Sequence, residues 1–77
     1  MNAASQLALQ VDPDCEVEVV ERRGPEERTV LLGPLPEPQA RELAALLLNR
    51  PEPPAEPGPW RLAIAGGVRV VELRHRA

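Results

Sequence analysis

Ten prolines interrupt this chain of 77 residues, and they limit where helices and strands can form. Proline fixes φ and lacks a backbone N–H, so it is excluded from helix interiors and central strands. Five of the ten lie in residues 51–59, PEPPAEPGP, which we interpret as a stiff, extended connector. The alternative is a docking site for a proline-binding module, although its flanking charges, Glu52 and Glu56, are acidic.

Before the connector, residues 15–21 and 28–33 alternate apolar and polar side chains, which predicts two strands. The intervening residues 22–27 contain Gly24-Pro25, so a turn and an antiparallel hairpin are expected. A single register satisfies both the apolar and the charged cross-strand pairs. Its pairs are Val17–Leu32, Val19–Val30, Glu21–Arg28 and Arg22–Glu27.

A helix is predicted over residues 37–48, because apolar side chains recur there at helical spacing. Pro38 is tolerated in the first turn, Asn49 is a suitable C-terminal cap, and Pro51 prevents continuation. The apolar stripe consists of Ala40, Leu43, Ala44 and Leu47, widened by Leu46 and Leu48.

After the connector, residues 60–65 and 68–74 are two alternating segments separated by Gly66-Gly67, which predicts a second hairpin with a two-residue turn. Trp60 is the only aromatic residue and is expected to anchor the core. The expected pairs are Ala65–Val68, Leu62–Val71, Trp60–Leu73 and Arg61–Glu72.

Together these elements predict a small α+β fold with the order ββαββ. Two hairpins form one antiparallel sheet, and the helix packs on one of its faces. Residues 15–75 form the single domain, and residues 1–14 form a flexible N-terminal segment. The strand order does not follow from the sequence. The face expected to meet the helix carries Val17, Val19, Val30, Leu32, Trp60, Leu62, Ile64, Val71 and Leu73.

The other face of this sheet has more apolar side chains than a solvated face requires. Contiguous apolar patches bordered by charge mark interaction sites, although β propensity alone also enriches strands in valine. We therefore expect a non-catalytic protein-interaction module, a homodimeric accessory or regulatory subunit that binds itself or another protein. The expected interaction residues are Val20, Leu31, Arg61, Ala63, Val68, Val70 and Glu72.

The alternative function is weak nucleic-acid binding through the C-terminal hairpin, which carries four arginines against one glutamate in residues 60–77. The net charge of −3 and the lack of aromatic residues that could stack on bases argue against it. The arginines in question are Arg61, Arg69, Arg74 and Arg76.

Catalysis, cofactors and metal binding are not expected. The only cysteine, Cys15, and the only histidine, His75, lie at opposite ends of the sequence. The charges of Asp14 and Glu16 disfavour a thiolate at Cys15, and no glycine-rich phosphate loop is present.

The N-terminus has neither a basic region nor an apolar run of signal-peptide length, and no segment approaches the roughly 20 apolar residues of a membrane span. With a single cysteine, this predicts a cytoplasmic protein without a membrane partner. All nine basic residues are arginine, and alanine and proline are abundant, a bias typical of GC-rich bacterial genomes.

Residues 28–47, RTVLLGPLPEPQARELAALL, resemble the core of the sporulation-related repeat, a peptidoglycan-binding domain. In that family a strand ends in Gly-Pro-aromatic and leads into an alanine-rich helix. Gly33-Pro34-Leu35 matches in position but lacks the aromatic residue, and no second helix is expected. No function is carried over from this resemblance.

Overall fold

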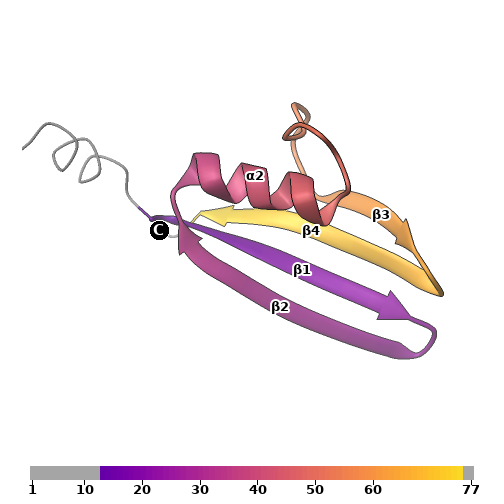
Figure 1. The fold of residues 1–77 in the computed structure, drawn as a ribbon. Helices are drawn as coiled ribbons and strands as arrows, with labels where there is room; N and C mark the ends of the chain where they lie inside the picture. Colours follow the sequence, from indigo (N-terminus) through magenta and orange to yellow (C-terminus); the bar gives the residue numbers. More distant parts are fainter. Residues whose placement is uncertain (1–12, 76–77) are drawn as a thin grey trace, which may run out of the picture.

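The computed structural model of the protein describes residues 13–75, so most of the N-terminal segment 1–14 lies outside the described residues. Over these residues, a four-stranded antiparallel sheet with one helix confirms the predicted α+β fold and its ββαββ order (Figure 1). The strands are arranged β2-β1-β4-β3, so β1 and β4 are central. The elements are β1 (Cys15–Arg23), β2 (Glu26–Leu35), α2 (Glu37–Leu47), β3 (Trp60–Ile64) and β4 (Gly67–His75).

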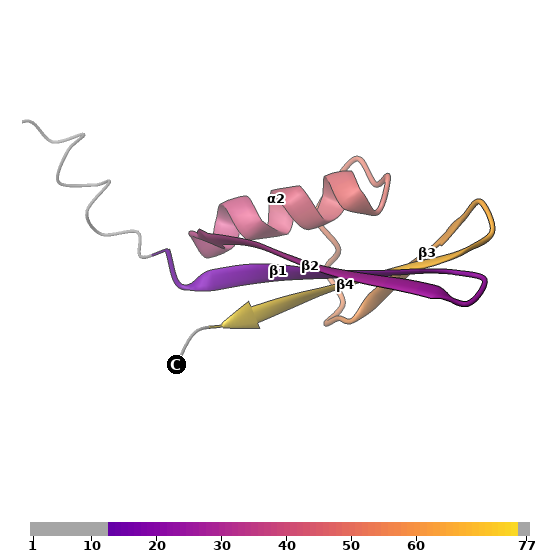
Figure 2. The ribbon, with the colours of Figure 1, turned by 90° about the horizontal axis from the view of Figure 1, so that it is seen from below.

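Helix α2 lies on one face of the sheet (Figure 2). Its apolar stripe packs against the central strands. Ala40 and Ala44 are fully buried there, as the helical spacing predicted. The prediction for Leu46 was wrong: its side chain is 72% exposed, because it points away from the sheet. The buried core consists of Cys15, Val17, Val19, Ala40, Ala44, Leu48, Trp60 and Val71.

Helix α2 is capped at its C-terminus by Asn49, as the sequence predicted. Asn49 adopts a left-handed φ of 55°. Its N–H donates to the carbonyl of Leu46, and the N–H of Arg50 donates to that of Ala45. This pair of bonds is the Schellman arrangement, which satisfies carbonyls that the helix leaves unpaired. The chain then enters the proline-rich connector, which leads to β3 (Figure 1).

The first hairpin has the predicted register. Val17 is opposite Leu32, Val19 opposite Val30, and Glu21 opposite Arg28. The second strand is longer than expected, because β2 continues past a register shift near its end and reaches Leu35. Only one further residue then separates the strand from α2, so the start of the helix is held close to the end of the sheet.

The register predicted for the second hairpin was wrong by two residues. Ile64 pairs with Gly67, so the turn is Ala65-Gly66 rather than Gly66-Gly67. Gly67 belongs to β4, where it is paired with Arg23 on β1, and only glycine fits there because an added Cβ atom would collide with the carbonyl oxygen of Arg22. A shift of two residues preserves the predicted faces of the sheet. The observed pairs are Trp60–Val71, Arg61–Val70, Leu62–Arg69 and Ala63–Val68, in place of Trp60–Leu73, Arg61–Glu72, Leu62–Val71 and Ala65–Val68.

Trp60 is buried, as predicted, and connects the core to the connector. Its indole N–H donates to the carbonyl of Glu56 at 3.0 Å, and Gly58 lies against the indole ring. Pro54 is also buried, and Arg50 forms an ion pair with Glu56 at 2.7 Å. The connector therefore packs onto the domain. Within residues 13–75, no helix is long and apolar enough to cross a membrane.

Replacing Trp60 with alanine should leave the protein largely unfolded. Truncating a large aromatic core residue costs about 3–5 kcal/mol, and a chain of this length has roughly 4–11 kcal/mol in total. Urea denaturation followed by far-ultraviolet circular dichroism measures the loss. A midpoint close to that of the wild-type protein would contradict the core position of Trp60.

Replacing Gly67 with alanine should destabilise the protein more than replacing Gly66. Gly66 has a φ of +78°, but a Cβ added there would meet no atom of the described residues within 4 Å. Alanine at Gly66 therefore costs only about 1–2 kcal/mol of backbone strain. At Gly67 the added methyl collides with the backbone of Arg22. Unfolding free energies of the two variants test this order, and equal losses would favour the register in which both glycines form the turn.

Candidate functional site

The sheet face opposite α2 carries a strip of apolar side chains at its centre. Val20 on β1 is paired with Val70 on β4, which the strand order makes its direct neighbour. Val68 follows on the same face of β4 and is paired with Ala63 on β3. We call Val20, Ala63, Val68 and Val70 the open-face patch. These residues are half-buried or exposed within the single chain.

Charged side chains border the open-face patch along the strands. On β1, Glu18 and Arg22 lie on either side of Val20 and point to the same face. Each has a partner within the chain: Glu18 accepts a hydrogen bond from Arg74 at 3.2 Å, and Arg22 is paired with Glu27. On β1 the patch is therefore bordered by an acidic residue at one end and a basic residue at the other, each held by a partner of opposite charge.

The remaining predicted interaction residues lie around this patch. Arg61 is exposed and stands opposite Val70, at the β3 edge. Glu72 is opposite Glu18, and Leu31 is on the other side of Glu18, with 52% of its surface exposed. Leu31 is thus the diagonal neighbour of Val20, beside Glu18 and Thr29. All seven predicted residues share one face.

The arginines proposed for nucleic-acid binding do not form one surface. Arg61 and Arg74 lie on the open face, and Arg74 is held by Glu18. Arg69 lies on the opposite face, and Arg76 lies outside the described residues. A continuous basic track is therefore absent from the part of the hairpin that the structure describes.

The side chain of Arg69 links the strands to the helix on the helix side of the sheet. Its Nε donates to the Glu21 carboxylate at 2.6 Å, and its Nη1 donates to the carbonyl of Leu47 at 2.8 Å. A guanidinium at the C-terminus of a helix interacts favourably with the helix dipole. With 22% of its side chain exposed, Arg69 joins β4, β1 and α2.

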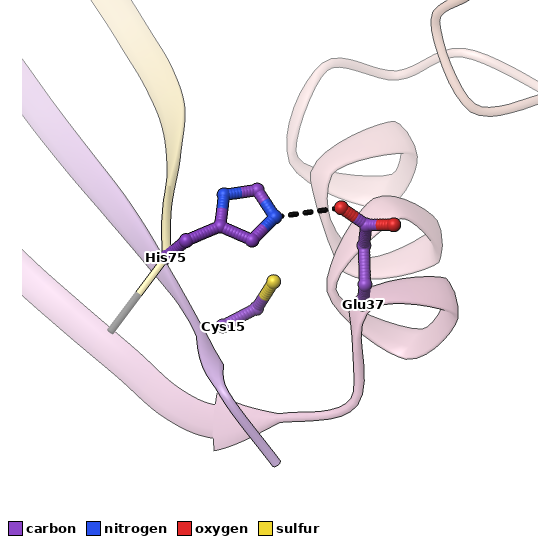
Figure 3. Close-up of side chains that lie close together, drawn as sticks. All are labelled: Cys15, Glu37 and His75. Atoms are coloured by element: carbon purple, nitrogen blue, oxygen red, sulfur yellow. Dashed lines mark hydrogen bonds and ion pairs between the residues drawn. The ribbon is translucent and has the colours of Figure 1, made fainter. Parts of the chain in front are cut away.

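A second group of reactive side chains gathers at the other end of the sheet. The thiol of Cys15, the carboxylate of Glu37 and the imidazole of His75 each place one ligand atom within 4.8 Å of the other two (Figure 3). We call these three residues the sheet-end cluster. His75 lies just beyond the strand predicted over residues 68–74, but in the structure it is the last residue of β4 and is paired with Cys15. The two residues are distant in the sequence but adjacent in space.

The protonation of the sheet-end cluster follows from its surroundings. Burial raises the pKa of the Cys15 thiol, and the negative charges of Asp14 and Glu37 raise it further, so the thiol is protonated at neutral pH. The hydrogen bond from His75, 2.6 Å long, lowers the pKa of Glu37. In the absence of a ligand the cluster therefore consists of a carboxylate bound to an imidazole N–H, above a neutral thiol.

Comparison with known proteins gives no relative: no protein family matches the chain, and no curated protein or solved structure shows detectable similarity. The resemblance of residues 28–47 to the sporulation-related repeat thus gains no support. The open-face patch and the sheet-end cluster are the two candidate functional sites of the described residues.

The hydrogen bond between Glu37 and His75 should make the folding stability depend on pH in the acidic range. The pKa of Glu37 is lower in the folded chain than in the unfolded chain, so its contribution is present above the unfolded value of about 4.3 and is lost as the pH falls through the folded value. Glu37→Gln should therefore lose less stability than the wild-type protein between pH 6 and about pH 3. Urea denaturation at both pH values measures this difference.

The control for this experiment is Glu42→Gln, which removes the same charge from an exposed position on the same helix. It should lose as much stability on acidification as the wild-type protein. A loss in Glu37→Gln as large as that in Glu42→Gln would show that the Glu37–His75 bond does not contribute.

Proposed function

We propose that the protein is a small, non-catalytic interaction module that forms a homodimer through its open sheet face, as an accessory or regulatory subunit. The observation that supports this most is the pairing of Val20 with Val70 in the two central strands. The face of an antiparallel sheet that meets water normally carries polar side chains. Here its middle is apolar, and a second protein surface would remove it from water.

The arrangement of charge on β1 favours a second copy of the chain as the partner. A two-fold symmetric interface must be complementary to itself, because the same surface contributes from both sides. Glu18, Val20 and Arg22 alternate along one face as acidic, apolar and basic. If the two-fold axis crosses the strands at Val20, the valines meet each other and each Glu18 faces Arg22 of the second copy.

The small size of the core provides a second reason for association. Among the described residues, its fully buried side chains are the small Val17, Val71, Cys15, Ala40 and Ala44, and Leu48 and Trp60 are its larger members. Small domains with little buried apolar surface are commonly stabilised by oligomerisation. The free, buried thiol of Cys15 suits a reducing compartment, so we place this function in the cytoplasm.

Replacing Val70 with glutamate should abolish self-association while leaving the fold intact. In the monomer, a charge on a solvated sheet face changes stability by no more than about 0.5 kcal/mol. In the dimer, the same charge would be buried against its own copy without a partner. Analytical ultracentrifugation over a wide concentration range gives the association state, and circular dichroism gives the fold.

The matched control is Leu46→Glu, which replaces an aliphatic side chain with the same charge on the outer side of α2. It should associate like the wild-type protein. A wild-type chain that stays monomeric at high concentration would overturn the homodimer. Unchanged association in a folded Val70→Glu would move the interface to the helix or to a strand edge, and loss of association in Leu46→Glu alone would place it on the helix.

A further inference from the structure

The sheet-end cluster combines the three side-chain types that bind transition metals, and none of them is required by the proposed dimer. Cys15 begins β1, Glu37 begins α2, and His75 ends β4, so three separate elements contribute one residue each (Figure 3). Their ligand atoms approach one another closely although Glu37 and His75 are partly exposed and free to turn toward solvent.

The backbone holds these residues together independently of any side-chain contact. Cys15 is paired with His75 on one side and with Leu35 on the other, so it lies between the ends of β4 and β2. From Leu35 a single residue, Pro36, leads into the first turn of α2, where Glu37 lies. Antiparallel pairing and this short connection therefore fix all three Cα positions.

The position of the thiol is the most restricted of the three. Cys15 is fully buried on the helix side of the sheet, and in Figure 3 its sulfur points toward the space between His75 and Glu37. The imidazole and the carboxylate, bonded to each other, lie over it. A cation placed between these three groups would be reached by one sulfur, one nitrogen and one oxygen atom.

We propose that Cys15, Glu37 and His75 bind a zinc ion. Thiolate and imidazole together are typical ligands of Zn²⁺, whereas Mg²⁺ and Ca²⁺ prefer oxygen ligands alone. Bond lengths of about 2.0–2.3 Å place the ligand atoms of a tetrahedral zinc ion about 3.4 Å apart. The cluster reaches this spacing when the ligand atoms of Glu37 and His75, now 2.6 Å apart and within 4.8 Å of the thiol, separate slightly and come within about 3.4 Å of the fixed sulfur.

Binding replaces the existing interactions without leaving a charge unpaired. The thiol loses its proton to solvent and becomes a thiolate. The imidazole of His75 exchanges its Nε2 proton with solvent for one on Nδ1, so that Nε2 is free to bind, and its hydrogen bond to Glu37 is replaced by two bonds to the metal. With a thiolate, a carboxylate and a neutral imidazole as ligands, the zinc ion and its protein ligands together carry no net charge. Three protein ligands leave the fourth position to water.

Cobalt(II) serves as a spectroscopic probe for this site. It adopts the same tetrahedral geometry as Zn²⁺, and a thiolate ligand gives a charge-transfer band in the near ultraviolet besides visible d–d bands. The untagged, full-length protein titrated with Co²⁺ should develop both, and added Zn²⁺ should abolish them. Absence of the charge-transfer band in the folded wild-type protein would overturn the proposal.

Variants of the exposed ligands identify the residues without disturbing the core. Glu37→Gln and His75→Gln should each weaken Zn²⁺ binding, measured by isothermal titration calorimetry, by at least about tenfold. Glu42→Gln, on the same helix, should bind Zn²⁺ like the wild-type protein. Cys15→Ser should lose the charge-transfer band. If both Glu37→Gln and His75→Gln kept the wild-type affinity, the site would be refuted even where Cys15→Ser fails to fold.

Discussion

The antiparallel pairing of β1 with β4 is the interaction on which the rest of the structure depends. Nine residue pairs, from Cys15–His75 to Arg23–Gly67, join the two hairpins into one sheet. An isolated two-stranded hairpin is at best marginally stable in water, whereas four strands present a face on which a helix can pack. The same pairing brings Val20 beside Val70 and Cys15 beside His75, so both functional proposals depend on it.

The helix is much shorter than the sheet. It therefore covers only part of the sheet face on its side, and that part is apolar whereas the uncovered part is charged. Eleven helical residues span about 16 Å, whereas nine strand residues span about 30 Å. The buried residues Cys15, Val17 and Val19 lie in the part of β1 under the helix. Beyond them Glu21 and Arg23 occupy the same face, and Arg69 links the end of the helix to this charged region.

Sequence patterns were sufficient to predict the structural features that are determined by residues close together in the chain. Alternation and the Gly24-Pro25 turn predicted the first hairpin with its register, and apolar spacing predicted the helix. The same patterns assigned every strand residue of the open-face patch to one face, because a register error of two residues preserves faces. The patch itself became contiguous only through the strand order.

The features that the sequence could not predict are those set by residues distant along the chain. Two adjacent glycines indicate a turn, but Gly67 is needed because the backbone of Arg22 approaches it from another strand. Likewise, Cys15 and His75 gave no sign of proximity, since they meet only through the β1–β4 pairing. Opposite charges at Glu21 and Arg69, and at Glu16 and Arg74, were available signals for that pairing, and Glu21 forms an ion pair with Arg69 at 2.6 Å.

The pairing of β1 with β4 can be measured directly by nuclear Overhauser effects between backbone protons of opposite residues. The structure requires contacts between Val19 and Val71 and between Glu21 and Arg69, together with those of the first hairpin. Their observation would support the sheet order from which the open-face patch and the sheet-end cluster both follow. Contacts between β2 and β3 instead, with none between β1 and β4, would contradict it.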